Sequence, residues 1–212
     1  MLRLIPKNQQ KRQIPPELAS LGLPERLLEL LLDREIDTPE KIERYLHPKR
    51  EDLLDPMLMQ DMDKAVNVIR DAIEKHEEIT VFGDYDVDGV TATAILLTYL
   101  RKQGAQVGFY IPDRHGEGYG LNIAAIEQIA THSKLLIVDC GITCAAEVAR
   151  AKELGMRVIV TDHHQLGPQI PECEAVLNPL LGHYPFRRLC GAGVAFKLVQ
   201  AMGGTEAIEP LW

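Results

Sequence analysis

The sequence predicts an α/β fold in which a mostly parallel sheet is flanked by helices, and three observations lead to this prediction. From residue 79 onward, short apolar runs rich in Val, Ile and Leu alternate with longer segments of helical periodicity. The apolar runs lack alternating polar side chains, which is typical of strands buried on both faces of a parallel sheet. Acidic residues or histidines follow several of these runs directly. Open α/β sheets bind their ligands at that place, beyond the carboxyl ends of the strands.

Residues 1–60 are expected to form a small helical N-terminal segment that ends in a connector. A leucine-rich helix is expected at 24–34, because its leading proline suits the first turn of a helix. Thr38 is the expected N-cap of a second helix, since Pro39 follows it and also favours a helix start. The connector is expected at 48–60. We see no catalytic chemistry in this segment and favour a role in packing against the main domain.

The main domain is expected to span residues 61–212 and to begin with a helix at 61–76, where apolar side chains recur at helical spacing. Strands are expected at 79–82, 107–111, 135–138, 158–161 and 175–177. The helices between and after them are expected at 90–103, 122–130, 143–154 and 193–202. An alternation of this kind places helices on both faces of one sheet.

The composition is that of an ordinary globular protein, with 46% hydrophobic and 25% charged residues. No apolar run approaches the ~20 residues of a membrane helix, and the N-terminus lacks the apolar core of a signal peptide. We therefore expect a cytoplasmic protein without membrane contact. The net charge of -8 argues against a protein that coats nucleic acid with a basic surface. It allows a nuclease, because acidic metal ligands lower the formal charge and bound cations restore it locally.

The cysteines do not predict a metal site, because none of them belongs to a C-x-x-C pair. A zinc knuckle is therefore not expected. Small buried hydrophobic side chains in a reducing compartment are the interpretation we favour. The residues concerned are Cys140, Cys144, Cys173 and Cys190.

The most informative stretch is 81–89, VFGDYDVDG, in which Asp84, Asp86 and Asp88 follow an apolar run and precede Gly89. Carboxylates so close together repel one another, and a divalent metal is the usual group that neutralises such a set. If the strand geometry continues through Asp86 and Asp88, both side chains point to the same side. The alternative is an Asp-rich turn that caps the following helix, and the motif alone leaves it open.

Two further strand ends carry side chains of the same kind. Asp139 follows the run at 135–138, and taken alone it would be an ordinary turn residue. Asp162, His163 and His164 follow the next run. Adjacent histidines point in different directions, so one can ligate a metal while the other faces a substrate phosphate. Asp162 is suited to hold an imidazole in one tautomer. The alternative is an ordinary pair of surface histidines.

Carboxylate and imidazole ligands without a thiolate favour Mn²⁺ or Mg²⁺ over structural zinc. A site with two such ions is suited to phosphoryl transfer, because one ion activates water and both stabilise the charge of the transition state. The sequence therefore predicts a metal-dependent enzyme whose centre lies at the carboxyl edge of the sheet.

Two accessory segments are candidates for holding a substrate. In the glycine-rich loop at 114–120, Arg114 could fork onto a phosphate and Tyr119 could stack on a base. An ordinary exposed arginine in a flexible loop is the alternative. At the start of the last helix, the N–H groups near Gly191 and Gly193 could receive a phosphate. Glycines that merely permit close packing are an equal alternative there.

The motifs taken together resemble those of the DHH phosphoesterase superfamily, named for Asp-His-His as at 162–164. Within it, the chain is similar to the RecJ single-stranded-DNA exonucleases over about residues 50–212. The motifs that match in order and spacing are GDYDVDG at 83–89, GYGL at 118–121, VDCGI at 138–142, VTDHH at 160–164, NP at 178–179 and CGAGVAFKL at 190–198.

This resemblance implies a centre of two Mn²⁺ or Mg²⁺ ions. The ligands that it implies are Asp86, Asp88, Asp139 and His163. It also implies that His164 contacts the scissile phosphate, that Asp162 orients a histidine, and that Asp84 is a supporting acid. The implied activity is 5′-to-3′ degradation of single-stranded DNA in recombination and repair. A single-stranded-DNA-binding protein or a helicase would be the partner in the cell, and the expected oligomeric state is a monomer.

The chain departs from the superfamily pattern at two places. Relatives that cut short oligonucleotides or cyclic dinucleotides, or hydrolyse pyrophosphate, carry a histidine where this chain has Phe82, as expected for the RecJ branch. The family also has a further metal-ligating Asp beyond the segment that ends at residue 198, and this chain stops at Trp212 before it. We expect an N-terminal fragment, truncated before its last strand and before a second (DHHA1-like) domain and an OB-fold. Such a fragment is expected to be weakly active or inactive.

Three other functions remain as alternatives. The first is another DHH-family phosphodiesterase that acts on oligonucleotides or cyclic dinucleotides. The second is a non-catalytic nucleic-acid-binding relative, against which the intact Asp and His sets argue. The third is a haloacid-dehalogenase-type phosphatase, whose nucleophile motif D-x-D-G-T resembles the sequence at 86–89. In this chain Val90 replaces the threonine of that motif, and residues 162–164 are left unexplained.

Overall fold

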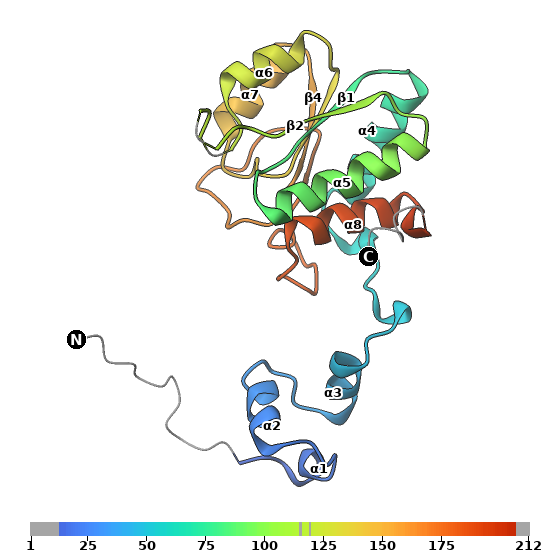
Figure 1. The fold of residues 1–212 in the computed structure, drawn as a ribbon, viewed down its shortest axis with the longest axis vertical. Helices are drawn as coiled ribbons and strands as arrows, with labels where there is room; N and C mark the ends of the chain where they lie inside the picture. The colour runs from blue at the N-terminus through green and yellow to red at the C-terminus, as the bar shows by residue number, and fades with distance from the viewer. Residues whose placement is uncertain (1–12, 115, 119, 207–212) are drawn as a thin grey trace, which may run out of the picture. The chain divides into compact units, whose positions relative to one another are not determined.

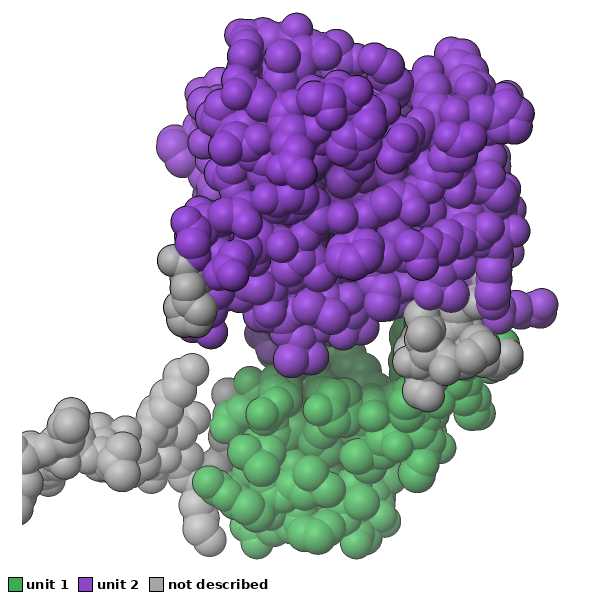
Figure 2. All heavy atoms as spheres, turned by 45° about the horizontal axis from the view of Figure 1, so that its top comes forward, with its two compact units in different colours: residues 1–53 green, residues 54–212 purple. Residues whose placement is uncertain are grey.

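The computed structural model describes residues 13–206 except residues 115 and 119. The chain divides into two compact units between Leu53 and Leu54, which are coloured separately in Figure 2. The sequence placed the start of the main domain at residue 61. In the structure Leu54 already packs against the core of the larger unit, and its carbonyl oxygen accepts a hydrogen bond from Lys197 Nζ at 2.6 Å.

The smaller unit is built from short helices around a leucine-rich core. Its elements are α1 (Pro16–Ala19), α2 (Glu25–Leu32), α3 (Pro39–Leu46) and the 3₁₀ turn η1 (Arg50–Asp52). The core side chains are Leu18, Leu28, Leu31, Leu32 and Ile42. Thr38 is the N-cap of α3 and accepts a hydrogen bond from the Lys41 N–H at 3.3 Å, which confirms its predicted role. Pro24 stands one position before α2, as its N-cap residue, instead of inside the first turn.

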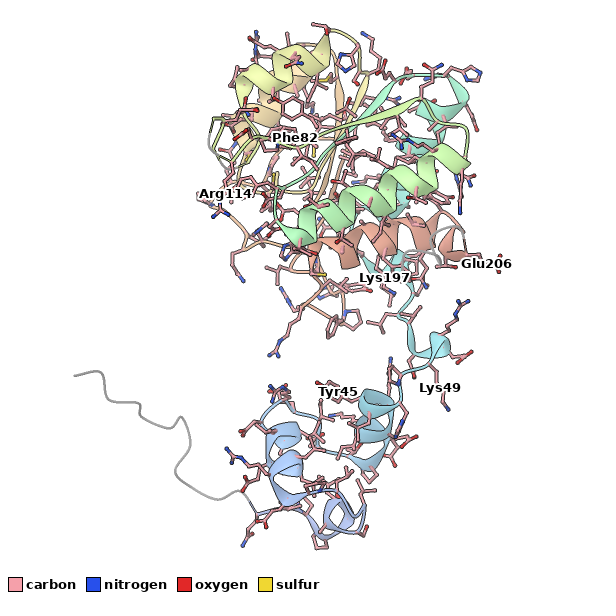
Figure 3. The ribbon with its side chains drawn as sticks, in the orientation of Figure 1. Tyr45, Lys49, Phe82, Arg114, Lys197 and Glu206 are labelled. Carbon is pink, nitrogen blue, oxygen red and sulfur yellow. The ribbon has the colours of Figure 1, made fainter. Side chains whose placement is uncertain are left out.

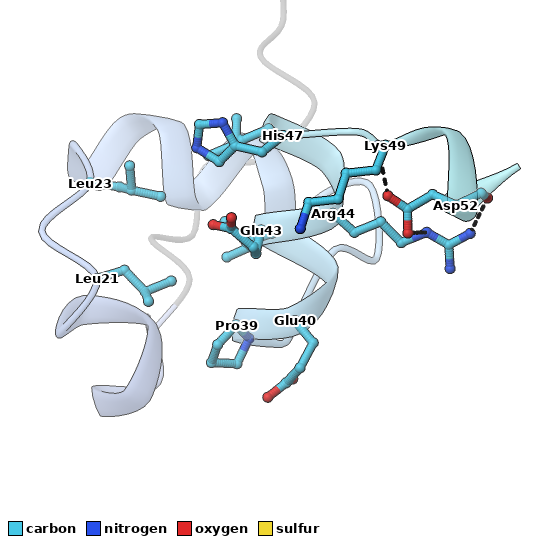
Figure 4. A pocket seen from close by; sticks show the side chains of 11 residues that line it. Leu21, Leu23, Pro39, Glu40, Glu43, Arg44, His47, Lys49 and Asp52 are labelled. Carbon is cyan, nitrogen blue, oxygen red and sulfur yellow. Dashed lines mark hydrogen bonds and ion pairs between the residues drawn. The ribbon is translucent and has the colours of Figure 1, made fainter.

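A surface pocket of about 620 Å³ lies within this smaller unit, along α3 (Figure 4). Beside it, Asp52 pairs with Arg44 Nε at 3.2 Å and accepts a hydrogen bond from the Lys49 N–H at 2.8 Å (Figure 4). None of the residues that the sequence selected for metal or substrate binding lines this pocket. The residues that the sequence selected for metal or substrate binding all belong to the larger unit.

The larger unit contains a five-stranded sheet whose strand order is β2-β1-β3-β4-β5. The strands are β1 (Ile79–Phe82), β2 (Val107–Tyr110), β3 (Leu135–Val138), β4 (Arg157–Thr161) and β5 (Ala175–Leu177). Every described pair of neighbouring strands is parallel. The sheet is thus entirely parallel, and the prediction of an α/β fold with a mostly parallel sheet is confirmed.

Helices cover both faces of this sheet (Figure 1). One face carries α4 (Met62–Glu74), α5 (Val87–Lys102) and α8 (Gly191–Ala201), which share one apolar core with Val81 of β1. The other face carries α6 (Ile123–Ala130) and α7 (Ala145–Glu153), which share a second core with Phe82. Successive strand residues therefore feed opposite cores, as strand periodicity requires.

Two connections complete the description of the larger unit. The 3₁₀ turn η2 (Pro56–Leu58) precedes α4. A long loop without regular structure joins β5 to α8. None of the helices that the structure describes is long and apolar enough to cross a membrane.

The strand order fixes where a ligand site is expected. β1 has β2 on one side and β3 on the other. The connection after β1 therefore runs toward one edge of the sheet, and the connection after β2 runs back toward the other edge. In open α/β sheets such a reversal opens a crevice beyond the carboxyl ends of the strands. Phe82 and Val138, the last residues of β1 and β3, are direct neighbours in the sheet. The acidic residues that follow them, Asp84 and Asp139, are therefore delivered to the same edge.

Candidate metal centre

The aspartates after β1 lie in a tight turn that leads into α5. Asp84 is only 3% exposed, and its Oδ1 accepts a hydrogen bond from the Tyr85 N–H at 2.6 Å. Asp86 is the N-cap of α5, and its Oδ1 accepts a hydrogen bond from the Gly89 N–H at 2.8 Å. The strand geometry that we considered for Asp86 and Asp88 is not present, because the strand ends at Phe82 and the capping bond starts the helix at Val87.

Asp88, in the first turn of α5, is held by the first turn of α8. Its Oδ2 accepts a hydrogen bond from the Gly191 N–H at 2.6 Å, and its Oδ1 accepts one from the Ala192 N–H at 2.9 Å. His163 Nε2 lies 3.2 Å from Asp88 Oδ2. Burial alone would raise the pKa of Asp88, but these N–H groups, the Cys190 thiol and His163 outweigh it and lower the pKa.

A substrate phosphate at the N–H group of Gly191 is one of two equal interpretations of the sequence. In the structure this N–H group holds the carboxylate of Asp88 instead. A Cβ on Gly191 would lie 2.7 Å from Asp139 Oδ1 and 3.1 Å from Asp88 Oδ2. A Cβ on Gly193 would lie 3.0 Å from the Leu189 side chain. Both positions therefore fit the alternative interpretation, in which the glycines allow close packing, against the carboxylates at Gly191 and against Leu189 at Gly193.

Asp139 is the most unusual carboxylate of the group. It is only 4% exposed, and no described residue gives its Oδ1 a hydrogen bond. Burial and the carboxylates of Asp162, Asp88 and Asp84 together raise the pKa of Asp139 to about 7, although His164 opposes them. A buried oxygen without a donor, among like charges, requires a cation or a proton beside it. The residues present therefore suit a bound cation.

Asp162 organises the two histidines. It is fully buried, and its Oδ2 accepts a hydrogen bond from the Ile142 N–H at 2.8 Å. Its Oδ1 lies 2.6 and 2.8 Å from the backbone nitrogens of His163 and His164, and 2.7 Å from His164 Nδ1. An ionised Asp162 places the ring proton of a neutral His164 on Nδ1 and so fixes the orientation of the ring. This geometry suits the predicted orienting role of Asp162.

The structure brings most of the predicted residues to one edge of the sheet. The residues that surround this edge are Asp84, Asp86, Asp88, Asp139, Asp162, His163 and His164. Within the described ranges, however, no three His, Cys, Asp or Glu side chains are gathered in a way that could hold a metal ion. The carboxylates of Asp84, Asp86, Asp88 and Asp162 accept hydrogen bonds from N–H groups of the chain, so the metal roles of this set stay predictions.

The loop after β2 contributes one described candidate. Arg114 is exposed and lies at the periphery of the larger unit (Figure 3). Its guanidinium carbon is 5.3 Å from the centre of the Tyr85 ring, within the range of a cation–π contact. Arg114 therefore reaches the motif that carries Asp84 and Asp86. Tyr119, the second candidate of this loop, lies outside the described residues, and its stacking role stays a prediction.

Sequence reasoning gave no individual role to three contributors to this edge. Tyr85 supports Arg114, and its position between two candidate acids was a usable signal. Asn178 donates from Nδ2 to the His164 carbonyl at 3.0 Å, and its place directly after a strand was also visible. The Ala192 N–H binds Asp88, but no sequence pattern indicates a backbone contact between two distant helix starts.

Comparison with protein families identifies the domain that contains this edge of the sheet. The family model described as the N-terminal domain of the DHH family matches residues 78–211. The chain belongs to the DHH family. The matched range of the DHH domain includes all the candidate residues, from Asp84 to Gly193, and includes the Asp162–His164 run that the haloacid-dehalogenase alternative left unexplained.

The DHH domain is similar in sequence to proteins named single-stranded-DNA-specific exonuclease RecJ. The RecJ of Bacillus subtilis is 46% identical over 179 residues, which cover 82% of this chain and 23% of that protein. The RecJ of Escherichia coli is 35% identical over 201 residues, which cover 92% of this chain and 34% of that protein. The chain thus spans less than half of the length of these curated relatives.

Solved structures show the same DHH architecture. An exonuclease RecJ bound to manganese has a TM-score of 0.67 at 38% identity, covering 75% of this chain and 40% of that one. RecJ of Thermus thermophilus in complex with Mn²⁺ has a TM-score of 0.69 at 30% identity, covering 93% of this chain and 28% of that one. The arrangement of sheet and helices described above is therefore that of the RecJ DHH domain.

Proposed function

We propose that this chain is the metal-binding part of a RecJ-type nuclease that hydrolyses single-stranded DNA in the 5′-to-3′ direction. One observation carries the proposal most directly. The buried Asp139 Oδ1 lacks a donor among the described residues and is surrounded by further carboxylates. The similarity to RecJ proteins, two of which are described as bound to manganese, supports the same conclusion.

Two Mn²⁺ or Mg²⁺ ions are the proposed cofactors, held by four side chains of this edge. They are Asp86, Asp88, Asp139 and His163. Carboxylate oxygens and an imidazole nitrogen suit these ions. An ionised carboxylate has about four lone-pair sites, so Asp86 and Asp88 can keep their N–H contacts while a second lone pair faces a metal. When bound, the ions supply water activation and charge stabilisation at the phosphate.

The remaining residues of the edge act on the substrate through their own contacts. In our proposal His164 keeps its Nδ1 paired with Asp162 and, when Nε2 is protonated as well, donates from Nε2 to the scissile phosphate. Asp162 is a positioning residue, because it is buried and acts through the histidines. Asp84 is a supporting acid, whose charge favours cations at Asp139. Arg114 is placed by Tyr85 and forks onto a phosphate oxygen pair.

The cellular role follows from the substrate. We propose a role in DNA recombination and repair in the cytoplasm, where single strands arise as intermediates. A single-stranded-DNA-binding protein or a helicase would deliver such strands, and the working unit is proposed to be a monomer.

The proposal is tested with a small chromogenic diester, the p-nitrophenyl ester of thymidine 5′-monophosphate, which does not require a DNA-binding groove. The protein should release p-nitrophenol slowly and only with Mn²⁺ or Mg²⁺. Asp139→Asn and His163→Ala should each lower this rate by about tenfold or more. Asp63→Asn is the matched control, because Asp63 is exposed in the first turn of α4, and its rate should be unchanged.

Labelled DNA then distinguishes the substrate class. Single-stranded DNA should be cut in preference to duplex DNA and to cyclic dinucleotides. Release of p-nitrophenol in EDTA, or equal rates in all three variants, would contradict the metal centre. A preference for cyclic dinucleotides would indicate a different DHH phosphodiesterase.

A further inference from the structure

The loop between β5 and α8 is fastened to the candidate metal centre at both ends. At its start, Asn178 Nδ2 donates to the His164 carbonyl at 3.0 Å. At its end, the Gly191 N–H donates to Asp88 Oδ2 at 2.6 Å. The intervening residues 182–189, GHYPFRRL, are called the rim loop below. Figure 1 shows this part of the chain as an orange loop next to the start of α8. The rim loop therefore borders the place where the scissile phosphate is proposed to bind.

The rim loop has a defined shape of its own. Tyr184 is only 2% exposed and belongs to the core shared by α4, α5 and α8. Arg187 donates from Nη2 to the Leu180 carbonyl at 2.5 Å, which ties the second half of the loop to its beginning. A loop anchored in this way presents its exposed side chains, Arg187 included, without first having to be ordered, which lowers the entropic cost of binding.

The side chains that the rim loop presents are of two kinds. Phe186 is 50% exposed, although it lies two positions after the buried Tyr184. Arg187 and Arg188 follow it and are exposed. The chain carries a net charge of -8, so two adjacent arginines shortly before the helix that binds Asp88 are a local reversal of charge. An aromatic ring next to cations is the combination with which proteins grip single-stranded nucleic acid.

We propose that the rim loop binds the single strand next to the scissile phosphate, with Phe186 stacked on a base and Arg187 and Arg188 paired with phosphates. This inference rests on the proposed function and deepens it, because it names a second contact for the same substrate. The positive charge of the two arginines favours a nucleic acid as the partner. Because the loop that contains the rim loop is hydrogen-bonded to the candidate centre at both ends, we assign the rim loop to the strand that enters that centre.

Binding of a labelled oligothymidylate to the full chain, measured by fluorescence anisotropy in EDTA, tests the rim loop without cleavage. Phe186→Ala should weaken binding by about five- to hundredfold, as for loss of one stacked base. Arg187→Gln combined with Arg188→Gln should lower the slope of log affinity against log salt by about 1.4, or ~0.7 for each phosphate contact. Arg101→Gln is the matched control, an exposed arginine in the last turn of α5, and should change neither quantity.

Photo-cross-linking supplies a readout that does not depend on affinity. An oligonucleotide with 5-iodouracil should cross-link to the peptide that contains Phe186, and Phe186→Ala should remove that product. Mn²⁺ binding, measured by calorimetry, should be unchanged in all rim-loop variants, which shows that they fold and keep the candidate centre.

Failure of this inference can be told apart from failure of the proposed function. A chain that binds Mn²⁺ but shows equal DNA affinity in wild type and rim-loop variants overturns the rim-loop contact alone. The rim-loop contact alone is also overturned if the chain binds Mn²⁺ but no DNA. It is overturned likewise if an acidic peptide binds the rim loop and DNA does not. A chain that binds neither Mn²⁺ nor DNA overturns both proposals.

Discussion

The carboxylate of Asp88 accepts a hydrogen bond from the backbone N–H of Gly191 at 2.6 Å, across 103 positions of sequence. This contact joins the first turn of α5 to the first turn of α8. Helix N-termini carry partial positive charge, so Asp88 is stabilised as an anion by a helix to which it does not belong. The motifs at 83–89 and 190–198 are therefore parts of one structure, and a change in either should disturb both.

A first prediction concerns the close approach at Gly191. The Cβ of Gly191→Ala would lie 2.7 Å from Asp139 Oδ1, so the carboxylate or α8 has to move. We expect a loss of stability of about 1–3 kcal/mol, as for overpacked sites, measured by urea unfolding. Gly116→Ala is the control, because its Cβ would meet no atom within 4 Å. Equal unfolding midpoints for the two variants would show that the carboxylates are not packed against α8.

A second prediction concerns the buried carboxylate of Asp162. In Asp162→Asn one accepting oxygen becomes an NH₂ group, which faces either the Ile142 N–H or the N–H groups of the histidines. We expect a loss of about 1–3 kcal/mol for each buried donor left without an acceptor, again measured by urea unfolding. If the NH₂ group faces the histidines, nitrogen NMR of the imidazoles should also show that His164 no longer holds its proton on Nδ1. Unchanged stability and an unchanged tautomer would exclude the orienting role.

A third prediction concerns the loop that carries Arg114. Tyr110 donates to Glu117 Oε2 at 2.6 Å, and this bond, with burial adding to it, raises the pKa of Tyr110 from 10.0 to about 12. A raised folded-state pKa means that this stabilisation is complete below the unfolded value of 10.0 and is lost as the pH rises through about 12. Glu117→Gln removes the negative acceptor, so ultraviolet titration should show one tyrosine ionising at a lower pH. A titration curve identical to that of wild type would contradict the hydrogen bond.

The sequence was sufficient for the layout of the sheet and for the edge that carries the candidate site. The runs 79–82 and 135–138 are strands with the predicted bounds. A short apolar run flanked by charged residues is typical of a strand that a parallel sheet buries on both faces. The convergence of Asp84 and Asp139 followed from the same geometry, since parallel strands present their carboxyl ends at one edge.

The details of the site depended on contacts that no local pattern contains. The start of α5 was expected at Val90, but the Asp86 side chain caps the Gly89 N–H and starts the helix at Val87. A capping bond and a strand continuation both suit an Asp-rich stretch, so the sequence left both open. The engagement of the Gly191 N–H by Asp88 depends on how two helices pack, and this could not be predicted from either motif alone.

The most direct test of the proposed metal centre is calorimetric titration of the metal-free chain with Mn²⁺. Wild type should bind the ion, whereas Asp139→Asn and Asp86→Ala should each lose about tenfold or more in affinity, because each removes a charged ligand. Asp63→Asn, on the exposed first turn of α4, should bind as wild type does. Equal Mn²⁺ affinity in wild type, Asp139→Asn and Asp86→Ala would contradict the assignment of this edge of the sheet as a metal centre.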